Sequence, residues 1–181
     1  MKKIFFQVVI IFVAFLTACS KKSDTVIIPP ASSDTVKLST LFGTWQLTGY
    51  TIETDDQYYY FNGEDINSHA FRTFIFSNGN YEAANNEWSG TYEHRQSDRE
   101  IVLTPLNTGF VPMTLMIDYL LTDQLHLSSP RVSVNPENPN ATDYEKFVAA
   151  QALSWLYNRN VDTSNVQTVR IGFDYFLKER N

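Results

Sequence analysis

Residues 71–81 read FRTFIFSNGNY, a stretch typical of a β-hairpin. An aromatic and β-branched run, Phe71 to Phe76, enters the turn residues Ser77 to Asn80, and Tyr81 starts the return strand. Asn-Gly between two apolar runs is the strongest short hairpin signal, because a type I′ turn needs positive φ at both central positions. The stretch therefore predicts two paired antiparallel strands.

The segments on either side repeat this pattern of short strands and turn residues. Further strands are expected at residues 44–53, 58–61, 88–93, 100–104, 113–120 and 125–127. Turn signals return at intervals of roughly ten residues, which is typical of an antiparallel barrel or sandwich.

The periodicity changes after a loop rich in proline and asparagine at 129–141. Thr142 and Glu145 form a capping box and predict a helix from Thr142 to about Asn158. Its apolar stripe is one-sided, so we expect the helix to pack outside the barrel. Residues 169–177 alternate as a last strand, which can pair with the first and remove the sheet edges. The predicted fold class is mainly β: an antiparallel barrel of about eight strands, one helix and a final strand.

The N-terminus is typical of a secretory signal. Lys2 and Lys3 precede an apolar run, Ile4 to Leu16, which is shorter than the roughly 20 residues of a membrane span. The run ends in Leu16-Thr17-Ala18-Cys19, which resembles the lipobox of bacterial lipoproteins, and Cys19 is the only cysteine. The alternative is an ordinary signal peptide with a chance cysteine. We expect residues 1–18 to be removed and Cys19 to be acylated.

The remaining chain divides into a tether at 19–37, which contains Pro29-Pro30, and a domain at 38–181. From Leu38 the chain has 9 basic and 18 acidic residues, a net charge of -9. Such a domain does not suit nucleic acid, whose phosphates need lysine and arginine. Attachment should rest on the acyl chains, which predicts a cell-envelope location on the outer membrane, at its periplasmic face or the cell surface.

Two further segments carry a resemblance to a known family. Gly43-Thr44-Trp45 resembles the Gly-x-Trp opening of lipocalin and calycin barrels. Phe74 to Tyr81, followed by Gly90-Thr91-Tyr92, resembles the small lipocalin-like lipoproteins of Bacteroidetes-type bacteria. The resemblance implies that Gly43 and Trp45 close one barrel end and that Arg131 stacks on the indole, a cation–π contact worth about 0.5–2 kcal/mol.

Motifs for catalysis and metal binding are absent from the sequence. His69, His94 and His126 have no zinc-binding spacing, and the acidic pairs Asp55-Asp56 and Glu64-Asp65 are interpreted as solvated turns. There is no nucleophile elbow and no glycine-rich phosphate loop. We therefore expect no enzyme activity, no cofactor and no metal.

The aromatic run Tyr58-Tyr59-Tyr60-Phe61 is open to two interpretations. It either packs the core or lines the mouth of a ligand cavity, in which case Tyr50, Tyr58 and Tyr60 are the candidate rim residues. The first hypothesis is a binding module whose small apolar or amphipathic ligand enters opposite Trp45. The second is a structural or protein-interaction lipoprotein with a filled barrel. The filling of the barrel discriminates between them, and the sequence identifies no protein partner.

Overall fold

The computed structural model describes residues 40–65, 71–83, 88–95, 99–135 and 137–180. The predicted signal peptide, Cys19 and the tether lie outside these residues, as does His69. The elements within the described ranges are β1 (Gly43–Glu53), β2 (Tyr58–Asn62), the 3-10 helix η2 (Gly63–Asp65), β3 (Thr73–Ser77), β4 (Asn80–Ala83), β5 (Gly90–Arg95), β6 (Glu100–Pro105), β7 (Met113–Leu120), β8 (Gln124–Ser128), β9 (Val132–Ser133), α1 (Asp143–Tyr157) and β10 (Thr168–Glu179).

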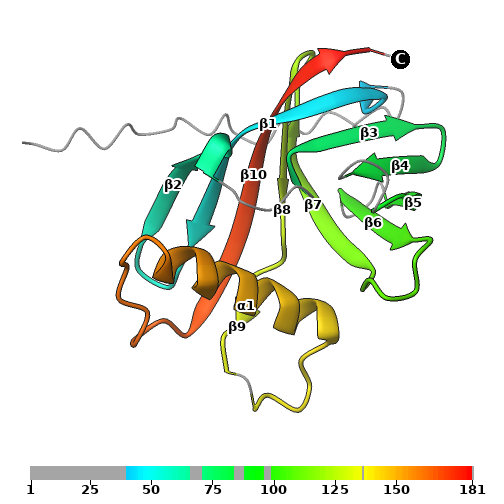
Figure 1. The fold of residues 1–181 in the computed structure, drawn as a ribbon. Helices are drawn as coiled ribbons and strands as arrows, with labels where there is room; N and C mark the ends of the chain where they lie inside the picture. The colour runs from blue at the N-terminus through cyan, green and yellow to red at the C-terminus, as the bar shows by residue number, and fades with distance from the viewer. Residues whose placement is uncertain (1–39, 66–70, 84–87, 96–98, 136, 181) are drawn as a thin grey trace, which may run out of the picture.

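Eight of these strands form a closed antiparallel barrel in the order β1-β3-β4-β5-β6-β7-β8-β10. The last strand returns to the first, and their register runs from Thr44 opposite Glu179 to Glu53 opposite Arg170 (Figure 1). Alternate residues of β10 face the interior, because Val169, Ile171, Phe173 and Tyr175 are all buried. The predicted fold class is confirmed, including closure by the final strand.

Strand β1 has a different neighbour along each half of one edge. Gly43 to Gln46 pair with β3, whereas Gly49 to Glu53 pair with β2, and the register with β10 shifts between Leu47 and Gly49. The hairpin β1–β2 therefore leaves the barrel ring and extends the sheet beside it. The short strand β9, within a segment expected to be a loop, pairs with the start of β10.

The predicted hairpin at Asn78-Gly79 forms, with Ser77 paired to Asn80. Its predicted turn type is wrong, because Gly79 has a φ of 73° while Asn78 does not have positive φ. Positive φ at the second central position alone is the φ pattern of a type II turn. The side-chain Nδ2 of Asn80 donates to the carbonyl of Asn78 at 3.1 Å, a hydrogen bond within the turn.

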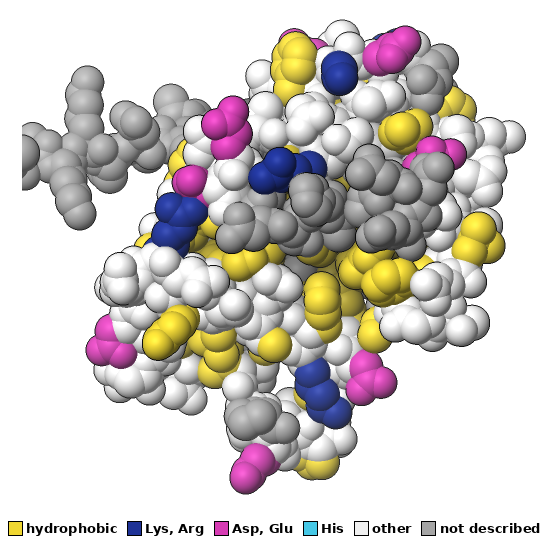
Figure 2. Space-filling model, in the orientation of Figure 1, with side chains coloured by type: hydrophobic (Ala, Val, Ile, Leu, Met, Phe, Trp, Pro, Cys, Tyr) yellow, Lys and Arg dark blue, Asp and Glu magenta, His cyan; other side chains and the backbone are white. Residues whose placement is uncertain are grey.

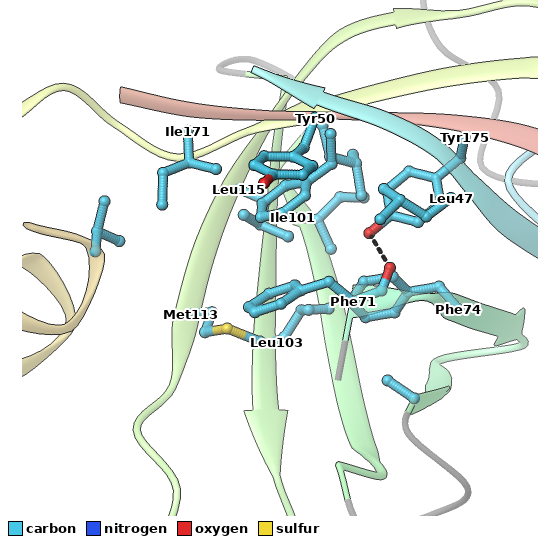
Figure 3. Close-up of a cluster of buried hydrophobic side chains, with 14 of the residues drawn as sticks. Leu47, Tyr50, Phe71, Phe74, Ile101, Leu103, Met113, Leu115, Ile171 and Tyr175 are labelled. Carbon is cyan, nitrogen blue, oxygen red and sulfur yellow. Dashed lines mark hydrogen bonds between the residues drawn. The ribbon is translucent and has the colours of Figure 1, made fainter. Parts of the chain in front are cut away.

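Aromatic side chains occupy much of the barrel interior (Figure 3). Phe71 stacks on Phe173 with ring centroids 4.8 Å apart, and Phe74 meets Tyr175 edge-on at 5.7 Å. The Tyr175 hydroxyl donates to the carbonyl of Phe71 at 2.9 Å, so this buried polar group is satisfied. These rings tie β10 to β3 and to the segment that precedes it.

Helix α1 lies across one end of the barrel (Figure 1). Its first turn is anchored by Tyr144, which donates to the carbonyl of Thr114 at 2.7 Å, and Trp155 near its end meets Phe173 edge-on at 6.3 Å. Trp45 is opposite Leu177 on β10, at the other end of that strand. The helix therefore packs outside the sheet and covers the end away from Trp45.

The capping box predicted for this helix is confirmed. The Glu145 amide donates to Thr142 Oγ1 at 3.2 Å, and the Thr142 amide donates to Glu145 Oε2 at 2.7 Å. Within the described ranges, the chain has no helix with the length and apolarity that a membrane span requires.

Candidate functional site

The first candidate site is the barrel interior beneath α1, where the sequence predicted a ligand entrance. The described residues there enclose a cavity of about 10 Å³. That volume holds about one water molecule, whereas ligand pockets measure roughly 300–1,000 Å³. Its lining comes from both the helix and the barrel: Phe71, Met113, Leu115, Ser129, Tyr144, Phe147, Val148, Gln151, Ile171 and Phe173. Side chains thus fill this end of the barrel, and the helix covers it.

The three candidate rim tyrosines do not come together. Tyr50 is 1% exposed and packs against Phe61 and Trp155 at centroid distances of 4.9 and 5.0 Å. Tyr58 and Tyr60 are 45% and 52% exposed and point to the opposite face of the sheet. The register explains this correction, because Tyr50 pairs with Phe61 and directly opposed residues share a face.

The residues assigned to barrel closure do not all lie at the same end of the barrel. Trp45 is 0% exposed, as expected, and its indole donates to the carbonyl of Leu41 at 2.8 Å. Gly43 adjoins the end of β10, where a β-carbon would lie 2.7 Å from the carbonyl oxygen of Glu179. Arg131, in contrast, bonds Glu53 Oε2 at 2.7 Å, at the far end of β1 from Trp45. The predicted stacking of Arg131 on Trp45 is therefore wrong, because a carboxylate at the other end holds the guanidinium.

A polar network that the sequence did not predict covers the outer face of β1, β10, β8 and β7. Arg170 bonds Asp118 Oδ1 at 2.7 Å and lies 3.7 Å from Glu53 Oε1. His126 lies between two carboxylates, with Nδ1 2.6 Å from Asp174 Oδ1 and Nε2 3.3 Å from Asp118 Oδ2. Both ring nitrogens are thus engaged, and this histidine joins β7, β8 and β10 in one network.

Two outward-facing glycines make room for rings on this face. A β-carbon at Gly172 would lie 2.8 Å from Nε2 of His126, and one at Gly49 would lie 2.6 Å from Cζ of Tyr60. Gly49 is directly opposite Asp174 in the β1–β10 register. The wall of the barrel is therefore recessed at neighbouring positions, where flanking strands lay an imidazole and a phenol against it.

The largely apolar groove beside this recess has a volume of about 380 Å³. We call it the outer groove, and it is lined by Thr48, Tyr60, Tyr119, Gln124, Asp174, Tyr175 and Phe176. Asp174 Oδ1 also accepts a hydrogen bond from the Tyr119 hydroxyl at 3.1 Å. Burial, and secondly the charge of Asp174, raise the pKa of Tyr60 and of Tyr119. The outer groove combines exposed rings with one carboxylate and has ligand size.

A second hollow of about 650 Å³ lies at the end of α1. Its lining is more polar and includes Tyr50, so two of the candidate rim residues, Tyr50 and Tyr60, line hollows, but different ones. Arg159 bonds Asp65 Oδ2 at 3.1 Å and lies over the ring of Phe61 at 5.5 Å from its centroid. Arg159 and Asp65, two of the three charged residues that line this hollow, thus pair with each other, and Glu64 is the third.

The remaining chemical candidates that the structure describes, Asp55 and His94, do not line the outer groove. Asp55 accepts hydrogen bonds from Thr168 Oγ1 at 2.6 Å and from the backbone amides of Gln167 and Thr168, and these bonds lower the pKa of its carboxyl to about 2. Burial lowers the pKa of His94 on β5. No group of three histidine, cysteine or acidic residues among the described positions is arranged to hold a metal ion.

The face that carries α1 also presents hydrophobic side chains to solvent (Figure 2). Tyr157, at the end of the helix, is 76% exposed, and Leu106 after β6 is 73% exposed. Apolar surface of this kind is typical of faces that meet other proteins, when it forms a continuous patch.

Comparison with known proteins gives no family, because no family model, curated protein or solved structure matches this chain. The closed eight-stranded barrel is consistent with the calycin-like architecture that Gly43 and Trp45 imply. Membership of the lipocalin-like lipoproteins stays a prediction, and the fold found here is a closed antiparallel barrel compatible with a ligand-binding module.

Proposed function

We propose that the chain is an envelope lipoprotein, acylated at Cys19, whose barrel binds a small amphipathic ligand in the outer groove. The contrast between the two cavities carries this proposal. The cavity beneath α1 measures about 10 Å³, whereas the outer groove measures about 380 Å³. Of these two, only the outer groove offers a ligand both rings and a carboxylate. The hollow at the end of α1, of about 650 Å³, has the more polar lining and contains the Arg159–Asp65 pair.

The rigidity of the barrel supports the same proposal. The outer groove takes its side chains from β1, β2, β7, β8 and β10, which are joined by continuous pairing. Binding groups on strands keep their geometry better than groups on loops, so less ordering entropy is lost on binding.

The binding test uses the full chain, purified in a non-ionic detergent, and isothermal titration with alkyl compounds that carry cationic, neutral or anionic heads. We expect saturable binding of at least one head group, weakened about threefold or more in Tyr60→Ala. Tyr157→Ala is the control, because Tyr157 is an exposed ring at the end of α1 and does not line the outer groove. Absence of saturable binding for every head group contradicts the proposal.

The anchor requires its own test. Cells that express the chain are grown with a labelled fatty acid, and the chain is isolated and compared with Cys19→Ala. We expect label on the first and none on the second, with the second released from the membrane fraction. An unlabelled wild-type chain contradicts lipidation and leaves the binding proposal to be judged alone.

The second candidate function is protein interaction by a filled barrel. The filled interior and the exposed side chains of Leu106 and Tyr157 favour it. It replaces the first proposal if no head group binds saturably and if cross-linking of intact cells captures a partner that Tyr157→Ala no longer captures.

A further inference from the structure

We propose that the outer groove recognises an alkylammonium cation, which the Asp174 carboxylate pairs with and which the rings of Tyr60, Tyr119 and Phe176 surround. This inference rests on the proposed function, since it names the chemical class of ligand for the same groove.

The carboxylate of Asp174 has no cationic side chain beside it among the residues that line the outer groove. The nearest arginine along the strand, Arg170, is bonded to Asp118 and lies close to Glu53. Arg131 is likewise held by Glu53. The two arginines and these two acids therefore balance one another, and the ionisable partner of the Asp174 carboxylate is His126, whose Nδ1 lies 2.6 Å from Oδ1.

The two hydrogen bonds that described side chains make to the Asp174 carboxylate both go to one oxygen. Nδ1 of His126 and the hydroxyl of Tyr119 both bond Oδ1. Both groups also fix the orientation of the carboxylate, because they come from two other strands. Oδ2 is thus the oxygen that a ligand cation would meet, in a position set by the network.

Three rings line the outer groove together with the carboxylate, each from a different strand. Tyr60 comes from β2, Tyr119 from β7 and Phe176 from β10. Tyr60 is about half exposed, and Phe176 is also exposed to solvent. Tyr119 stacks on His126 with centroids 5.4 Å apart, so its ring cannot swing freely. Faces of aromatic rings attract organic cations, and several rings around one site form the cage that binds quaternary ammonium groups.

The electrostatics of the groove agree with this arrangement. The charge of Asp174 acts at the tyrosine hydroxyls, where it helps burial to raise their pKa values. The domain from Leu38 has a net charge of -9, which also draws cations toward the surface and repels anions. A hard metal ion fits less well, because both nitrogens of His126 are occupied and rings cannot replace the hydration shell of a small ion.

The test titrates the full chain in a non-ionic detergent with tetramethylammonium, with propylammonium and with neutral 3,3-dimethylbutan-1-ol, which has the shape of choline without its charge. Binding is followed by isothermal titration and by the proton resonances of the tyrosine rings. The variants are Asp174→Asn, Tyr60→Leu and Phe176→Leu. Glu179→Gln is the matched control, since it removes the same charge from the same strand at an exposed position outside the groove.

We expect at least one of the two cations to bind at least tenfold more tightly than the neutral alcohol. Asp174→Asn should reduce cation affinity about tenfold, each leucine variant should reduce it about threefold or more, and Glu179→Gln should leave it unchanged. The leucine variants change exposed rings, so they remain informative if Asp174→Asn unfolds the network.

Equal affinity for the cations and the alcohol overturns the inference, as does an equal effect of the Asp174 and Glu179 variants. In that case, saturable binding of a neutral ligand that is weakened in Tyr60→Leu still supports the proposed function, while the inference of cation recognition fails. If cations and neutral compounds alike give no saturable binding, both proposals fail together.

Discussion

The phenol of Tyr60 covers the α-carbon of Gly49, and a β-carbon there would stand 2.6 Å from Cζ of the ring. The two residues are diagonal neighbours on β1 and β2, since Gly49 pairs with Asn62 and Thr51 pairs with Tyr60. The floor of the outer groove thus depends on the absence of one methyl group.

This relationship predicts a coupled pair of substitutions. Gly49→Ala should reduce the free energy of unfolding by about 1 kcal/mol or less, the low end for overpacking, because the methyl group displaces a ring that is half exposed and can turn toward solvent. The double variant Gly49→Ala with Tyr60→Ala should recover most of that loss, and denaturant unfolding of all four proteins measures it. Simple additivity of the two single effects would show that the ring and the glycine are independent.

The buried indole at the other end of the barrel predicts a large loss on truncation. Trp45→Ala should lower the free energy of unfolding by about 3–5 kcal/mol, as for other buried aromatic truncations. The control is Tyr157→Ala, because that ring is exposed and should cost well under 1 kcal/mol. A loss of similar size in both variants would contradict the role of Trp45 in the core.

Stability should fall in alkali because of buried tyrosines. Burial raises the pKa of Tyr81 from 10.0 to about 12, and it also raises the pKa of Tyr175 and Tyr144. Between pH 10 and 12 the unfolded chain loses a proton from Tyr81 that the folded chain retains. The stabilising contribution is therefore complete below pH 10 and is lost as the pH rises toward 12.

The variant Tyr81→Phe measures how much of the alkaline loss of stability comes from the Tyr81 hydroxyl. The variant should show a shallower decline above pH 10, followed by circular dichroism. At pH 7 it should be as stable as the wild type or more stable, because the hydroxyl has no hydrogen-bond partner among the described residues. An unchanged alkaline slope would contradict the assignment, and Tyr157→Phe supplies the control.

A separate loss of stability is expected in acid. Hydrogen bonds from Thr168 and the amide of Gln167 lower the pKa of Asp55 from 3.8 to about 2. The contribution of Asp55 is thus complete above pH 3.8 and is lost as the pH falls through about 2. Asp55→Asn should flatten the acid limb of the stability curve, whereas Asp56→Asn in the same turn should not. The prediction fails if both variants keep the slope of the wild type.

Patterns within a few residues predicted local structure well. The capping box at Thr142 and Glu145 forms as expected, and the hairpin at Gly79 forms with a different turn type. The alternation in β10 correctly indicated a strand able to close the barrel. Each of these features is decided by neighbours in the chain, which a single sequence records directly.

Features that depend on which strands become neighbours were not predictable in the same way. Arg131 was assigned to Trp45, yet the β1–β10 register and β9 place it beside Glu53. The outer groove joins β2, β7 and β10, and no periodicity within one strand records that meeting. Gly49 and Gly172 were the sequence features that could have indicated the outer groove, because a glycine inside a strand often marks the close approach of another group.

The pairing of β1 with β10 sets the order in which this chain can fold. The first barrel strand, β1, can pair with β10 only after β10 has been synthesised. The barrel therefore stays open until synthesis has passed Glu179. Until then β1 and β8 each present an unpaired edge, and the entropy of joining the distant ends is lost in one late step. A ribosome-bound or partly translocated chain is therefore kept short of the native state by its own topology, and removal of the final strand alone would leave two edges open to intermolecular pairing.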